Sequence, residues 1–218
     1  MLMVNHLIGF GAFASQPATV VFCANSLDTV DRITFTFSSV SFSTAAADRR
    51  VVMALWEQGG AVGISSVTIG GVSASQLVGS GGTTNPLVSL WIAAVPTGTS
   101  GNVVVQFGGG TANCAIAVWA VYGIGSNTAF ATATTSAAEN PASESLSVPS
   151  NGVAIAASRL VTNTTAFTWS GLTEDFDALL EVGRYSGASD AFASAATPTI
   201  TANSGELSRL VAVSFAPA

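Results

Sequence analysis

The chain has 218 residues, of which 8% are charged, where an ordinary soluble domain has about 25%. Six Arg, twelve Asp plus Glu and no Lys give a net charge of −6, which excludes binding of a nucleic-acid backbone through a basic surface. The 49% apolar fraction excludes a disordered acidic tail, and two Cys exclude a disulfide scaffold. No apolar run reaches the roughly 18 residues of a membrane helix, so we expect no membrane insertion.

The chain begins with an apolar arm of about residues 1–16. No Lys or Arg precedes the small residues Ala12 and Ala14, so we expect no signal peptide. Two interpretations of the arm stay open, because it either contacts a partner or folds back on its own domain. For a partner contact, the apolar anchors are Leu2, Val4, Leu7, Ile8, Phe10 and Phe13.

Strand signals dominate the next sixty residues. Residues 33–37 alternate apolar and hydroxyl side chains, and the alternation changes phase at Ser38-Ser39, which predicts a bulge. Residues 51–56 are apolar without alternation, as in a strand covered on both faces. Gly70-Gly71 between two short apolar runs predicts a tight hairpin over residues 67–74.

Further strands are predicted at a spacing of roughly 8–14 residues, which favours a sandwich or barrel over βα units. Residues 175–182 fit one or two helical turns or a strand, and we favour the strand. We therefore expect an all-β fold, an antiparallel β-sandwich of jelly-roll or related Greek-key type with ten or more strands. The further predicted strands are Leu87–Val95, Val103–Phe107, Cys114–Tyr122, Leu146–Val148, Val153–Arg159, Ala166–Trp169 and Leu210–Phe215.

Residues 125–145 are rich in Ser, Thr and Ala and contain few large apolar side chains. A domain boundary there would leave strands on both sides that look incomplete alone. We therefore expect one sandwich domain over residues 1–218, with a long surface loop at about 125–145. No internal repeat of 20–50 residues is visible in the sequence.

Catalytic motifs are scarce. His6 is the only imidazole, so any Ser-His-Asp arrangement would have to use it, and we interpret it as a residue of the terminal arm. No zinc-binding pair, nucleophile elbow or phosphate loop is present. We predict a protein without catalytic residues, cofactor or metal, and not an enzyme.

Acidic residues gather at Glu174, Asp175, Asp177 and Glu181. In an extended strand, Asp175 and Asp177 would point to the same face. That pair suggests a cation site or a glycosidase pair, while a solvated edge strand is the simpler interpretation. The sequence does not decide whether Glu174, Asp175 and Asp177 bind a cation.

Four tryptophans offer either core packing or a sugar-stacking surface. Trp56, Trp91 and Trp119 lie in apolar runs and are predicted to be buried. Trp169 precedes Ser170-Gly171 at a predicted strand end and is the candidate glycan-stacking residue.

Two further pairs of residues have structural interpretations. Cys23 and Cys114 lie in apolar runs and are read as buried free thiols, with a disulfide left open. Arg49 and Arg50 are each expected to form a local salt bridge.

Several stretches together resemble β-rich virion structural proteins of tailed phages and prophages of alphaproteobacteria, namely head-decoration, head-fibre or tail-associated components. The resemblance covers most of the chain, and its motifs carry no catalytic signature. The stretches are Leu7–Gly11, Thr44–Val52, Ile64–Val72, Ala117–Gly123 and Leu172–Asp177.

The resemblance implies a virion protein made in the bacterial host cytoplasm, most simply a capsid decoration, cement or head-spike protein that stabilises the assembled shell. Its implied partners are the major capsid protein and copies of itself in a trimer or other ring, with no nucleic acid. One alternative is a tail- or head-mounted module that binds host surface polysaccharide, for host attachment. A weaker alternative is a glycan hydrolase. The sequence does not separate capsid from tail.

Overall fold

The computed structural model describes residues 16–58, 63–80, 87–111, 113–160, 165–180 and 183–218. These residues form 17 β-strands in four antiparallel sheets and no helix, which confirms the all-β prediction. No helix long and apolar enough to cross a membrane is found in them.

Strands β1–β9 form an N-terminal unit (residues 19–122) of two sheets. Its inner sheet has the order β1-β9-β3-β7-β6, and its outer sheet has the order β2-β8-β4-β5. The eight strands other than β6 have the order of a jelly roll, and β6 extends the inner sheet. The bounds are β1 Thr19–Asp28, β2 Arg32–Ser41, β3 Arg50–Gln58, β4 Ile64–Ile69, β5 Val72–Ser73, β6 Ser75–Gly79, β7 Leu87–Ala94, β8 Ser100–Thr111 and β9 Asn113–Tyr122.

Strands β10–β17 form a C-terminal unit (residues 131–215), also of two sheets. Its inner sheet has the order β10-β17-β12-β15-β14, and its outer sheet has the order β11-β16-β13. The bounds are β10 Ala131–Thr134, β11 Ala142–Ser145, β12 Gly152–Leu160, β13 Thr168–Ser170, β14 Thr173–Leu180, β15 Gly183–Phe192, β16 Thr199–Asn203 and β17 Ser208–Phe215.

The two units repeat one topology. If β5 is left out, β1–β9 correspond in chain order to β10–β17, and each inner and outer sheet of one unit has the same strand order in the other. The turn glycines Gly71 and Gly171, which follow β4 and β13, even share a positive φ, of 80° and 83°. The β-sandwich prediction thus holds, and the structure adds that one strand order occurs twice along the chain, at a spacing of about 100 residues.

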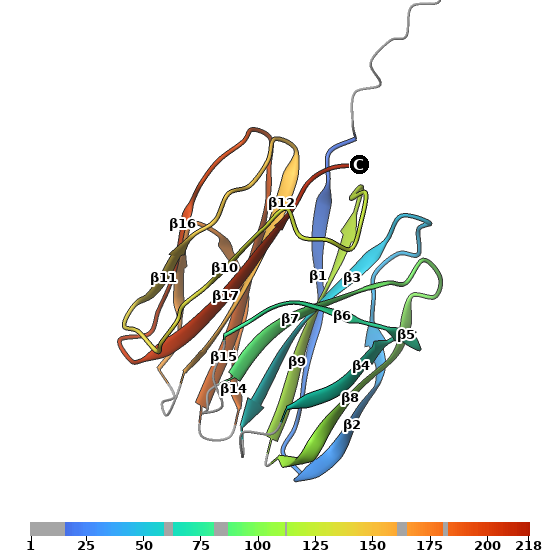
Figure 1. The fold of residues 1–218 in the computed structure, drawn as a ribbon, viewed down its shortest axis with the longest axis vertical. Helices are drawn as coiled ribbons and strands as arrows, with labels where there is room; N and C mark the ends of the chain where they lie inside the picture. The colour runs from blue at the N-terminus through green and yellow to red at the C-terminus, as the bar shows by residue number, and fades with distance from the viewer. Residues whose placement is uncertain (1–15, 59–62, 81–86, 112, 161–164, 181–182) are drawn as a thin grey trace, which may run out of the picture.

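The inner sheets of the two units pack face to face, so the molecule has four layers (Figure 1). Phe22 of β1 stacks on Phe176 of β14, and β6 lies next to β10. Because β1 corresponds to β10 and β6 to β14, these contacts are those of a pseudo-two-fold axis between the units.

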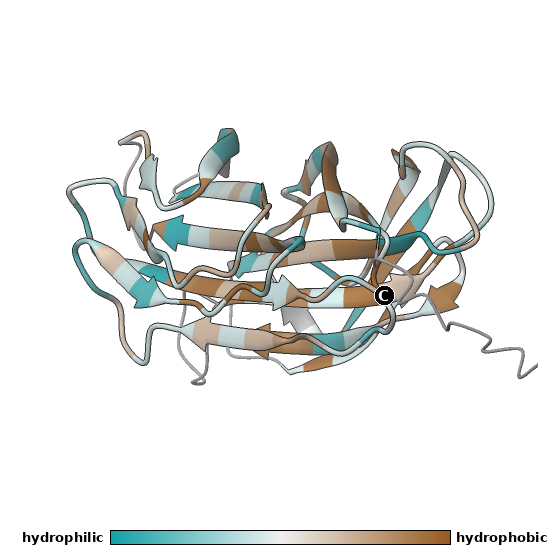
Figure 2. Ribbon diagram, turned by 90° about the horizontal axis from the view of Figure 1, so that it is seen from above, coloured by the Kyte–Doolittle hydropathy of each residue, from teal (hydrophilic) through white to brown (hydrophobic). Residues whose placement is uncertain are grey.

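Burial on both faces explains the apolar sequence of the inner strands. On β3, Val52, Ala54 and Trp56 point to the C-terminal unit, while Met53 and Leu55 point to the outer sheet of their own unit. The unbroken apolar run predicted for a strand covered on both faces is therefore confirmed. Figure 2 shows the apolar residues gathered along the strands in the middle of the molecule.

Local predictions for the N-terminal unit are also confirmed. Gly70 and Gly71 have φ of 59° and 80° and join β4 to β5, as a primed hairpin turn requires. The register of β2 shifts between Phe37 and Val40, where Ser39 has a φ of 56°, so the bulge lies where the apolar alternation changes phase.

The C-terminal unit deviates more from the prediction. Residues 173–180 are a strand, β14, as favoured, but residues 146–148 lie outside any strand, and Val148 forms an isolated bridge with Ala196. The expected loop at 125–145 contains β10 and β11, the first two strands of the C-terminal unit. The connection between the two units is therefore shorter than expected and runs from the end of β9 to the start of β10. These two strands consist of small and hydroxyl residues, so their apolar pattern is weak.

Candidate functional site

The predicted contact residues of the arm, Leu2 to Phe13, lie outside the described residues, as does His6. Trp169 is half-buried between the two sheets of the C-terminal unit, beside Phe167. Its Nε1 donates to Ser186 Oγ at 2.8 Å, and Ser186 Oγ donates to the carbonyl of Phe176 at 2.7 Å. The ring therefore packs against the core of the C-terminal unit and is held there by this hydrogen bond.

The acidic segment adopts a geometry that its spacing did not predict. The register between β14 and β15 shifts between Glu174 and Phe176, so Asp175 is an extra residue in a β-bulge. Asp175 accepts a hydrogen bond from Trp119 Nε1 at 2.7 Å, in the interface between the units. Burial raises the pKa of Asp175, although hydrogen bonds from Trp119 and Ser189 oppose this.

Asp177 faces the other side of β14. It accepts from Arg184 Nε at 2.7 Å and from the backbone N–H of Phe167 at 2.9 Å, within the C-terminal unit. The expectation that Asp175 and Asp177 share a face is therefore wrong, because the bulge reverses the alternation between them. Among the described residues, no group of three or more His, Cys, Asp or Glu side chains is arranged to hold a metal ion.

The other tryptophans and Cys114 fit their structural interpretations, whereas Cys23, predicted to be buried, is only half-buried. Cys23 and Cys114 are unbonded to each other, and burial raises the pKa of both thiols, which disfavours the nucleophilic thiolate. Trp56, Trp91 and Trp119 are buried as predicted.

Arg49 is a buried anchor that the sequence did not reveal. Its side chain is fully buried and donates five hydrogen bonds to backbone carbonyls, at 2.7–3.1 Å. The guanidinium thus fixes the chain after β2 to the chain after β7, and the expected local salt bridge is wrong for this residue. Arg50 likewise donates to backbone carbonyls, of Asp48 and Arg49. The acceptors of Arg49 are the carbonyls of Phe42, Ser43, Val95, Thr97 and Gly98.

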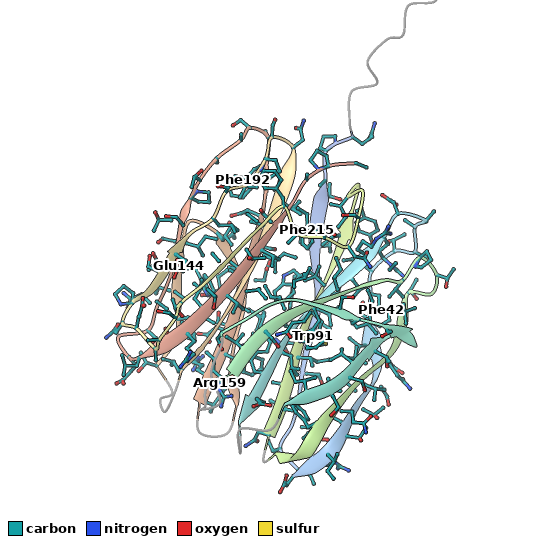
Figure 3. The ribbon with its side chains drawn as sticks, viewed as in Figure 1. Phe42, Trp91, Glu144, Arg159, Phe192 and Phe215 are labelled. Carbon is teal, nitrogen blue, oxygen red and sulfur yellow. The ribbon has the colours of Figure 1, made fainter. Side chains whose placement is uncertain are left out.

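Two buried charges lie at corresponding strand ends of the two inner sheets. Glu57, at the end of β3, and Arg159, at the end of β12, are each 1% exposed. Among the described residues, neither carboxylate oxygen of Glu57 has a hydrogen-bond partner, nor do Nε and Nη1 of Arg159, which is labelled in Figure 3. Burial raises the pKa of Glu57 to about 7 against the attraction of Arg159, and burial lowers the pKa of Arg159 to about 10.

The outward faces of both outer sheets are mostly uncharged, and the charged residues of these strands are Arg32 at the start of β2 and Glu144 on β11. In most outer strands, apolar residues alternate with the outward ones and point to the core. The exceptions are β5, whose Val72 is exposed, and β11, where Glu144 stands between Ser143 and Ser145. In the C-terminal unit, Ser143 Oγ and Thr201 Oγ1 are hydrogen-bonded at 2.9 Å across the outer face. The outward residues are Thr34, Thr36, Ser66, Thr68, Asn102, Val104 and Gln106 in one unit, and Ser143, Ser145, Thr168, Ser170, Thr199, Thr201 and Asn203 in the other.

A shallow hollow of about 420 Å³ lies beside the Gly70-Gly71 turn, over the buried ring of Phe42. Its lining combines apolar atoms with hydroxyl and amide groups and includes no charged side chain. The polar side chains are those of Thr68, Thr97, Ser100 and Asn102. A hollow of this kind suits a small neutral ligand rather than an ion.

Comparison with known proteins gave no relative of this chain: no family model matches it, and neither curated proteins nor solved structures show a significant similarity.

Proposed function

We propose that this protein is a structural component of a phage particle, and specifically a decoration or cement protein on the capsid shell. The observation that supports the proposal best is that the outward residues of both outer sheets are almost all hydroxyl or amide side chains. Surface charge normally keeps copies of a soluble protein apart, and this chain carries little of it. A surface of hydroxyl and amide groups suits close, repeated contact with neighbouring subunits.

The mechanism of a cement protein is mechanical. A ring of copies would straddle the joint between neighbouring shell subunits and add buried interface across it. Because the ring binds only the assembled shell, its binding free energy stabilises that assembled state. A standard contact buries about 1,600 Å² in total and would recur around each symmetry axis.

Electron cryo-microscopy of intact particles tests this role. We expect many copies at regular sites on the icosahedral shell, with the outer face of one unit against the shell subunits. Particles assembled without the protein should lose their DNA at a lower temperature or milder osmotic shock. A few copies confined to the tail or to one vertex would contradict the proposal.

The hollow beside Gly70-Gly71 favours a second candidate, a module on the particle that binds host polysaccharide. Its neutral hydroxyl and amide groups match sugar hydroxyls, and Phe42 and Val95 give it an apolar wall. A glycan array followed by calorimetry tests this role. A Thr68→Ala, Asn102→Ala variant should lose binding at least tenfold, whereas the control variant Thr168→Ala, Asn203→Ala on the other outer sheet should retain it.

The positions of two acidic side chains argue against a glycan hydrolase. Its acid pair was Asp175 and Asp177, and these carboxylates are bonded on opposite sides of β14. They do not face a common cleft in which both could act on one glycosidic bond.

A further inference from the structure

The first strand of the chain has an open edge. β1 pairs with β9 on one side, and the described residues place no strand on its other side. β1 is ten residues long, contains no Pro, Lys or Arg, and has Asp28 at its last position as its only charge. Natural proteins normally protect such an edge with charges or Pro, because unpaired backbone groups recruit other strands.

The edge strand of the other inner sheet that lies beside β1 is β14, and its charges protect it against pairing with further strands. β14, which lies next to β1 through the Phe22–Phe176 stack, carries the charges of Glu174, Asp175 and Asp177. The register shifts in both strands, between Phe22 and Ala24 in β1 and between Glu174 and Phe176 in β14, so the charges rather than a bulge distinguish the two edges. On β1 the side chains of Val21 and Leu27 are 42% and 43% exposed, and Val30 and Ile33 just beyond it are more than half exposed. Leu179 of β14 is 46% exposed as well, but it lies on the strand that carries the acids. Four of the eight exposed large apolar residues among those described therefore lie within residues 21–33.

A matching segment directly precedes this edge. Residues 1–15 join the described chain at Gln16 and contain no Asp, Glu, Lys or Arg. Leu2 and Val4, and later Ile8 and Phe10, recur at a spacing of two, which places each pair on one face of an extended strand. Fifteen extended residues reach about 50 Å, which exceeds the roughly 33 Å length of a ten-residue strand.

The connection to β1 opposes a hairpin within one chain. Pro17 has a φ fixed near −65°, so it cannot adopt the positive φ at the first position of a primed two-residue turn. Ala18 is 1% exposed, and its N–H donates to the carbonyl of Asn151 at 2.9 Å, on the C-terminal unit. Ala18, which directly precedes β1, is thus held against the body of the molecule and is not free to reverse the chain.

We infer that residues 1–15 of one copy add as a strand to the open edge of β1 in a second copy. The backbone groups of β1 then gain partners, and Val21 and Leu27 are covered by the apolar residues of the arm. Neither strand carries a charge along the contact apart from Asp28, so no pair of like charges meets within it. This exchange between copies does not depend on the particle role proposed above.

Disulfide trapping between two variants tests the inference. Both variants carry Cys23→Ser; one adds Gly9→Cys in the arm, and the other adds Val21→Cys on β1. After mixing and mild oxidation, we expect disulfide-linked dimers to form at least tenfold faster than with Leu207→Cys, a control site that is 53% exposed on the C-terminal unit. Equal rates at Val21 and Leu207 would overturn the inference.

A single chain that carries Cys23→Ser, Gly9→Cys and Val21→Cys distinguishes the two routes. A disulfide that forms within a monomer would mean that the arm covers its own edge, which overturns the exchange between copies. Light scattering of the full chain gives a second readout: Val21→Arg should lower the average mass toward that of a monomer. Val72→Arg, at a valine that is 39% exposed on β5, should not.

Discussion

The two units share one strand order but differ in what fills them. The core between the two sheets of the N-terminal unit has 18 buried residues, of which Ala93 is the single alanine, with four Phe, Trp91 and Met53 among the rest. The corresponding core of the C-terminal unit has 14 buried residues, and seven of them are alanine. The same topology thus encloses two cores of very different volume.

The difference teaches where the C-terminal unit obtains its stability. Burial of alanine removes little apolar surface from water, so a core that is half alanine contributes less free energy than one rich in Phe. The interface between the units contains Trp56, Trp119, Phe176 and Tyr185. We therefore expect the C-terminal unit to depend on this interface, while the N-terminal unit has a substantial core of its own.

The largest effect is expected from removal of an aromatic ring at that interface. Trp119→Ala deletes a fully buried ring and the hydrogen bond to Asp175, and should lower the free energy of unfolding by about 3–5 kcal/mol. Urea unfolding measures the change. Trp91→Ala, which removes a ring from the N-terminal core alone, is the matched control. A loss below about 1 kcal/mol for Trp119→Ala would show that the interface is not a shared core.

The second prediction concerns Arg49, the buried arginine that anchors two loops of the N-terminal unit. Arg49→Met removes five hydrogen bonds and leaves buried carbonyls without a donor, which should cost about 3 kcal/mol. Arg49→Lys should recover only part of this, because an ammonium group lacks the planar fork. Thermal unfolding measures the stability of each variant. Arg50→Met, at the neighbouring arginine, is the control and should change the free energy of unfolding by less than about 1 kcal/mol.

The third prediction tests how closely the two inner sheets approach. A Cβ on Gly187 of β15 would lie 2.7 Å from Phe176 and 2.7 Å from Trp119. Gly187→Ala should therefore destabilise the protein by about 1–3 kcal/mol through overpacking. Gly63→Ala is the control, since a Cβ there meets nothing within 4 Å. Equal stability of the two variants in urea would mean that the two inner sheets lie farther apart at Gly187 than the structure shows.

The smallest effect should come from pH. The pKa of Glu57 is raised from 4.5 to about 7 in the folded protein, so the folded state binds more protons than the unfolded state between these values. Stability should therefore fall by about 2 kcal/mol between pH 5 and pH 7 and level off about one pH unit above the folded pKa.

Urea unfolding at pH 5, 6, 7 and 8 measures this dependence. Glu57→Gln stays neutral at every pH, so its stability should fall less than that of the wild type, and at pH 8 it should be the more stable protein. Glu206→Gln, at an exposed position, should keep the wild-type pH profile. A profile that Glu57→Gln leaves unchanged would place the pH dependence elsewhere in the molecule.

The sequence predicted well those features that are local. The phase change at Ser38-Ser39, the turn at Gly70-Gly71 and the apolar strand at 51–56 each carry their signal within a few residues, and all three are confirmed. The strands at 131–134 and 142–145 were missed because Ala, Ser and Thr give little apolar contrast. Their pairing with β17 and β16 depends on residues about 60 to 80 positions later.

The repeated strand order and the buried charges could not be predicted for a related reason. The two units conserve strand order rather than side chains, so a search for repeated residues has little to match. Arg49 binds carbonyls up to 49 residues away, and nothing near it in the sequence marks them as acceptors. The face of Asp175 was mispredicted because a bulge is set by pairing with β15, which the spacing of the acids does not contain.

Native-state hydrogen exchange tests most directly the central claim that two jelly-roll units form one body through their inner sheets. We expect the amides of β3 and β9 and those of β12 and β17 to be the slowest in the molecule, and to exchange with the same opening free energy. That result would mean that both inner sheets open only in global unfolding. Faster exchange of β12 and β17, with β3 and β9 still protected, would contradict the claim, because the C-terminal unit would then unfold by itself.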